Sequence, residues 1–85
     1  MDIVWIVKAK YIEDYQIELT FNEGTKNIVN LKNYLTGKVF EPLKDIDYFK
    51  TFKKNSWTIE WDCGADFAPE FLYELAMENK NLKVH

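Results

Sequence analysis

Four acidic residues in the second half of the chain have types and spacing that suit metal or acid–base chemistry: Glu60, Asp62, Asp66 and Glu70. Carboxylate oxygens are the ligands that Mg²⁺ and Ca²⁺ prefer in proteins. The spacing does not match a calcium-binding loop, and Glu60 and Asp62 would share the solvent-facing side of a strand. Because Asp66 also suits the cap of a helix, a solvated surface is the favoured interpretation. A small-ligand or divalent-metal site at Glu60, Asp62 and Asp66 stays the alternative hypothesis.

Nucleophilic catalysis is not predicted, because it needs a nucleophile, a base and a group that orients the base. The single histidine, His85, is the last residue of the sequence, so neither Ser56 nor Cys63 has a positioned histidine partner. A lone cysteine is more often a small buried residue than a reactive thiol, so Cys63 is predicted to be structural. Three scattered glycines cannot form a phosphate loop, and one Cys with one His does not favour zinc. We therefore expect neither an enzyme nor a cofactor.

Aromatic residues are abundant, at 16% of the chain. Most of these rings must form the core, but a chain of this length buries few rings completely, and Trp and Tyr favour interfaces. An exposed aromatic patch or an unpaired strand edge is therefore predicted to bind a partner. The alternative is that every ring is core filler. The predicted binding residues are Trp5, Tyr15, Trp57, Trp61, Asp66 and Tyr73.

Composition limits the classes of partner. The chain has 85 residues, enough for one domain, with 47% hydrophobic and 29% charged residues. Its net charge is −3 and it has no arginine, the residue best suited to phosphates and base edges, so nucleic-acid binding is not expected. No apolar run approaches the ~20 residues of a membrane span, and the start does not resemble a signal peptide. With a single cysteine, a reducing cytoplasmic location is predicted.

Three strands are predicted in the first third of the chain. Residues 15–21 alternate apolar and polar side chains, which is typical of a strand with one buried face. Residues 25–31 follow a turn at Gly24 and complete an antiparallel meander. Residues 3–11 form the first strand, and the side chains predicted to share one of its faces are Ile3, Trp5, Val7, Ala9 and Tyr11.

The middle of the chain is less regular. Residues 31–35 have the spacing of one helical turn, which Gly37 would end. Residues 39–43 are predicted to be extended, because Pro42 disfavours a helical conformation at the residue before it. Asp45 or Asp47 would cap a short helix that ends near Phe52. Residues 53–55 are expected to form a polar break.

A fourth strand and a C-terminal helix complete the predicted fold. Residues 56–61 alternate, with Trp57, Ile59 and Trp61 on the buried face. Asp66 is predicted to cap a helix that runs to about Glu78 with Ala68, Phe71, Leu72, Leu75 and Ala76 as its apolar stripe. Residues 79–85 would be a frayed tail. We predict an α+β domain spanning residues 1–85: an antiparallel meander of about four strands, a short middle helix, and a C-terminal helix on one sheet face.

Several blocks of sequence resemble a bacterial family, the domain of unknown function 2442. They are LTFNEG at residues 19–24, VNL at 29–31, LTGKVFEPL at 35–43 with Phe49, and TIEWDCGADFAPEFLY at 58–73. The resemblance implies a short α+β protein, and some members are described as antitoxin-like and encoded beside a small toxin. In other members the domain precedes a helix-turn-helix; none is predicted within these 85 residues, so DNA-mediated autoregulation is not expected of them. The resemblance implies no catalytic residues.

These observations favour a protein-binding module that acts by contact, and the antitoxin-like half of a toxin–antitoxin pair is its expected form. The acidic net charge would complement a basic toxin encoded nearby. A homodimer is a further hypothesis.

Overall fold

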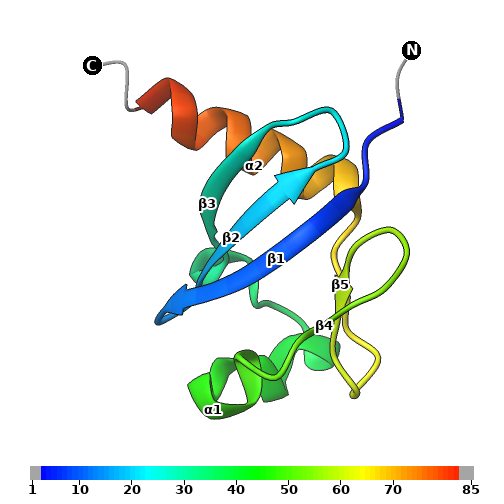
Figure 1. Ribbon diagram of the computed structural model, residues 1–85. Helices are drawn as coiled ribbons and strands as arrows, with labels where there is room; N and C mark the ends of the chain where they lie inside the picture. The colour runs from blue at the N-terminus through cyan, green and yellow to red at the C-terminus, as the bar shows by residue number, and fades with distance from the viewer. Residues whose placement is uncertain (1–2, 83–85) are drawn as a thin grey trace.

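A three-stranded antiparallel sheet with the order β1-β2-β3 forms the N-terminal part of the chain (Figure 1). The computed structural model describes residues 3–82, with side chains through residue 78. The strands are β1 (Ile6–Glu13), β2 (Gln16–Phe21) and β3 (Lys26–Asn30). Ile17, Leu19 and Phe21 of β2 are buried, as their alternation predicts. The predicted α+β class and the three-stranded meander are confirmed.

A bulge at Val7 changes the face that β1 buries. Ile6 pairs with Phe21 and Lys8 pairs with Thr20, so Val7 is an extra residue on β1. An extra residue breaks the two-residue period of the side chains. Ile6 is therefore fully buried and Val7 is 43% exposed, whereas Ala9 and Tyr11 pack against the core. The prediction that Val7 shares a face with Ala9 and Tyr11 is wrong.

The predicted fourth strand does not extend the meander. β5 (Ile59–Glu60) has two residues and pairs with β4 (Lys53–Lys54), which lies in the segment predicted to be a polar break. A turn replaces the start of the expected strand, because the Asn55 side chain accepts hydrogen bonds from the backbone of Trp57 (2.7 Å) and Thr58 (2.8 Å). Thr58 is buried and Trp57 is exposed, which is the reverse of the predicted alternation.

Short helices connect the two sheets. They are η1 (Lys32–Tyr34), η2 (Lys38–Lys44) and α1 (Ile46–Phe49). The extended conformation predicted for residues 39–43 is wrong, because η2 continues through Pro42. Complete burial of Leu43 and stacking of Phe40 on Phe67, with ring centroids 5.0 Å apart, outweigh the local bias before proline. α1 ends at Phe49, earlier than expected.

The C-terminal helix α2 (Pro69–Leu82) begins later than predicted. Proline suits a first helical position because it has no N–H to leave unpaired. The Leu72 N–H donates to the Ala68 carbonyl, so Ala68 and not Asp66 precedes the helix, and the predicted cap at Asp66 is wrong. Ala68 itself is exposed and so lies outside the buried stripe. The helix continues through residues 79–82, which were predicted to fray, and residues 83–85 lie outside the described residues.

The core lies on one side of the three-stranded sheet. α2 runs behind this sheet and packs mainly beside β3, while α1 and the short sheet lie below (Figure 1). Leu72 and Ala76 of α2 are fully buried, and the Ala76 carbonyl accepts a hydrogen bond from the Asn27 side chain at 3.0 Å. The opposite sheet face is left uncovered by the helices of residues 3–82.

The two candidate caps can be compared by substitution. The Asp45 carboxylate accepts a hydrogen bond from the Asp47 N–H at 3.0 Å, whereas Asp66 is exposed and only bridges Glu60 through the backbone. We expect Asp45→Ala to lower the free energy of unfolding by about 1 kcal/mol. Asp66→Ala should change it by less than about 0.5 kcal/mol. Urea titrations of both variants check this, and an equal loss at Asp66 would show that its side chain has a stabilising role after all.

Candidate functional site

The extended segment before β1 is held by Asn22. The Asn22 side chain accepts a hydrogen bond from the Trp5 N–H (2.8 Å) and donates one to the Ile3 carbonyl (3.0 Å), and the Asn22 N–H donates to the Trp5 carbonyl (3.0 Å). The Ile6 N–H donates to the Trp57 carbonyl at 2.8 Å. These bonds fix the segment against the 55–58 turn and set Trp5 beside Trp57.

The two tryptophans form the centre of an apolar surface. Their ring centroids are 5.8 Å apart and their planes meet at 83°, which is a favourable edge-to-face arrangement. Trp57 is 56% exposed and Ile3 is 65% exposed. Ile3 lies two residues before Trp5 in the chain and Val7 two residues after it, and both side chains are exposed. We call Ile3, Trp5, Val7 and Trp57 the tryptophan corner. Its two rings are among the predicted binding residues, and Ile3, Trp5 and Val7 were predicted to share one face of the first strand.

Two other predicted binding residues, Tyr15 and Tyr73, lie outside this corner and hold elements together. The Tyr15 ring meets Phe49 edge-on at 5.2 Å, and its hydroxyl donates to the Lys44 carbonyl. The Tyr73 ring meets Phe21 at 5.2 Å. The structure therefore brings together two of the six predicted residues, Trp5 and Trp57.

Trp61 is the most deeply placed of the predicted residues. It is 2% exposed, and its indole Nε1–H donates to the Phe49 carbonyl at 2.7 Å. Its ring contacts those of Phe49, Phe52 and Phe67. Trp61 is thus a core residue that joins α1 to the loop after β5.

The acidic residues do not converge. Asp62 forms an ion pair with Lys53 at 3.1 Å, and Glu60 accepts a hydrogen bond from the Asn55 side chain at 2.9 Å. Within residues 3–82, no group of three or more Asp, Glu, His or Cys side chains is placed to hold a metal ion. The arrangement of these carboxylates gives the metal hypothesis no added support.

Cys63 is exposed, so the prediction that it is buried is wrong. It lies in a turn in which the Gly64 N–H donates to the Trp61 carbonyl, and Gly64 has a φ of 96° that only glycine adopts readily. The thiol lies 3.6 Å from the Val39 carbonyl oxygen. A hydrogen bond with Cys63 and partial desolvation raise the pKa of Tyr48.

The family match covers most of the fold and part of the tryptophan corner. The profile of a family described as protein of unknown function (DUF2442) matches residues 6–78. The chain belongs to the DUF2442 family. No curated protein and no solved structure matches it. The DUF2442 match includes Val7 and Trp57, whereas Ile3 and Trp5 precede it. Among residues 3–82, no helix has the length and apolar character needed to cross a membrane.

The outer edge of β1 is poorly suited to strand addition in this DUF2442 chain. A second bulge leaves Ile12 as an extra residue, so β1 is interrupted near both ends. Lys8 and Lys10 lie between the bulges. Bulges and edge lysines are common features that prevent a further strand from pairing. Of the two contact modes predicted from the sequence, the geometry favours the aromatic surface over the strand edge.

Proposed function

We propose that this DUF2442 chain is a protein-binding module that acts by contact and uses the tryptophan corner as its binding surface. The observation that carries the proposal is the exposed Trp57 ring held edge-on against Trp5. Large exposed rings beside other apolar side chains are typical of binding surfaces, because a partner that covers them removes apolar surface from water.

The corner is held in place before any partner arrives. The Trp57 N–H donates to the Asn55 side chain, and its carbonyl accepts from Ile6, so the backbone on both sides of the ring is fixed. A preorganised anchor loses little conformational entropy on binding. Tryptophan is also among the residues that most often dominate the binding energy of an interface. These points support Trp57 as the central contact.

The biological form that we propose is the antitoxin-like partner in a toxin–antitoxin pair in the cytoplasm. The net charge of −3 would favour association with a basic toxin. A single cysteine, exposed and unpaired, suits a reducing compartment. A homodimer through the same corner is the competing assembly, since apolar patches also pair with their own copies.

Co-expression tests this proposal. The chain is produced together with the product of each adjacent gene, and co-purification in a fixed ratio is expected with one of them. If that product alone inhibits growth, co-expression of the chain should restore growth. Light scattering of the chain by itself identifies a homodimer by its doubled mass. If the chain neither co-purifies with a neighbouring gene product nor rescues growth, the antitoxin-like role is contradicted. A dimer that depends on the tryptophan corner would then replace it as the function of this surface.

A further inference from the structure

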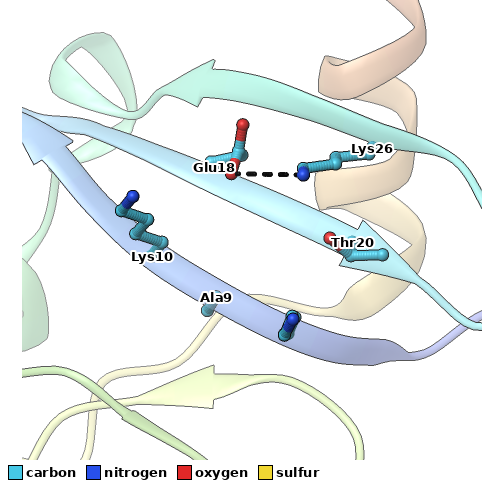
Figure 2. A pocket seen from close by; sticks show the side chains of 6 residues that line it. Ala9, Lys10, Glu18, Thr20 and Lys26 are labelled. Carbon is cyan, nitrogen blue, oxygen red and sulfur yellow. Dashed lines mark ion pairs between the residues drawn. The ribbon is translucent and has the colours of Figure 1, made fainter.

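The uncovered face of the three-stranded sheet carries a shallow hollow of about 270 Å³. Figure 2 shows side chains of all three strands around it, with α2 behind the sheet. The hollow is lined by Lys8, Ala9, Lys10, Glu18, Thr20 and Lys26. Three lysines and one glutamate give it a charge of +2, although the whole chain carries −3. The hollow is thus a local positive region on an acidic protein.

Strand register places a hydroxyl between two of the lysines. Thr20 in the middle strand pairs with Lys8 on β1 and with Lys26 on β3. Neighbouring strands lie about 4.8 Å apart, so the two lysines flank Thr20 on either side. A carboxylate above Thr20 would accept a hydrogen bond from its hydroxyl and lie between two ammonium groups.

The positive charge of these lysines is only partly neutralised by ion pairs within the described residues. Glu18 lies 3.9 Å from the Lys26 ammonium, at the limit of an ion pair, and the Lys26 side chain is well exposed. Lys8 and Lys10 take part in no ion pair within residues 3–82. Clustered like charges repel one another, and an incoming anion relieves that repulsion.

We propose that this face binds an acidic segment of a partner protein, laid over the sheet parallel to β1 in an extended conformation with carboxylates at alternate residues. Lys8 and Lys10 are two residues apart on β1, which separates them by about 6.7 Å. Alternate side chains of an extended peptide have the same separation, so successive carboxylates match successive lysines. This site goes beyond the tryptophan corner and does not depend on it.

Other occupants fit the hollow less well. Single-stranded nucleic acids bind where aromatic rings stack on bases, and no ring lines this hollow. The chain also lacks arginine and repels a polyanion through its net charge. A small organic ligand favours an enclosed pocket of about 300–1,000 Å³, whereas this hollow is smaller and open. Carboxylate side chains on a protein segment suit its size and charge best.

Fluorescence anisotropy with a labelled peptide of alternating serine and glutamate tests the proposal. We expect saturable binding to the full chain that weakens as salt is added. A peptide of the same composition with its glutamates in one block should bind more weakly. Lys8→Ala/Lys10→Ala should weaken binding by about five- to tenfold, since each exposed ion pair contributes a modest amount. Lys32→Ala/Lys38→Ala, which removes equal charge from exposed lysines of η1 and η2, is the matched control and should bind as the unchanged chain does.

Three outcomes would overturn this inference. Equal loss in both double variants would show that only overall charge matters. Tighter binding of an oligothymidine that depends on the same lysines would make nucleic acid the occupant. Displacement of the peptide by millimolar inorganic phosphate would indicate a simple anion site. Trp57→Ala should leave peptide binding unchanged, so the lysine-lined face and the tryptophan corner can fail separately.

Discussion

Replacing Trp61 with alanine is expected to lower the free energy of unfolding by about 3–5 kcal/mol. The side chain is 2% exposed and contacts the rings of Phe49, Phe52 and Phe67, so alanine would leave a cavity among them. Small domains are stable by only about 5–15 kcal/mol, so this single change removes a large share of the total. Urea unfolding followed by circular dichroism measures the loss.

Trp61→Phe separates the hydrogen bond from the packing. Phenylalanine keeps much of the ring contact but removes the Nε1–H that donates to the Phe49 carbonyl at 2.7 Å. Leaving that buried carbonyl unpaired should cost about 1–3 kcal/mol. If Trp61→Ala and Trp57→Ala lower stability equally, the assignment of Trp61 to the core and Trp57 to the surface is wrong.

The parts of the fold that the sequence predicts well are those set by local chemistry. β2 follows from strict alternation, because every second side chain between residues 17 and 21 is buried. Asp45, one of the two predicted caps, caps α1, and the hydrogen bond joins neighbours in the chain. Such features need only a few adjacent residues, and distant packing does not alter them.

The errors arise where a side-chain turn or packing against another segment overrules a local pattern. Alternation places Trp57 inside, but the Asn55 turn and the hydrogen bond from Thr58 to the Phe67 carbonyl (2.7 Å) bury Thr58 instead. Pro42 favours an extended chain, but burial of Leu43 favours the helical turn. At Leu43 tertiary packing decides between two locally acceptable conformations, whereas at Thr58 a local turn acts together with a hydrogen bond to a later segment.

The candidate surfaces show the same limit. Trp5 and Trp57 were each predicted to bind a partner, but their contact depends on Asn22 and on the backbone bond from Ile6 to Trp57. The lysine-lined face was not predicted at all. The lysines at positions 8 and 10 have strand spacing and could have marked a positive face, but only the register with Thr20 brings them together with Lys26.

Trp57→Ala is expected to weaken binding of the protein partner by about 30- to 1,000-fold, the range that corresponds to a dominant tryptophan contact of about 2–4 kcal/mol. The ring is already more than half exposed, so its removal should cost stability only through the contact with Trp5, about 1 kcal/mol. Isothermal titration calorimetry with the partner identified by co-expression measures the affinity. Circular dichroism confirms that the variant is folded.

Val39→Ala is the matched control for this prediction. Val39 is 46% exposed and lies on η2, which contributes no residue to the tryptophan corner. Its replacement by alanine therefore removes exposed apolar surface of another element. Unchanged affinity in Val39→Ala, together with a large loss in Trp57→Ala, would locate the partner at the corner, because general loss of surface hydrophobicity would affect both variants alike. If instead the partner binds Trp57→Ala as tightly as the unchanged chain, the ring is not an anchor. The contact must then lie on another surface, of which the lysine-lined face is the next to test.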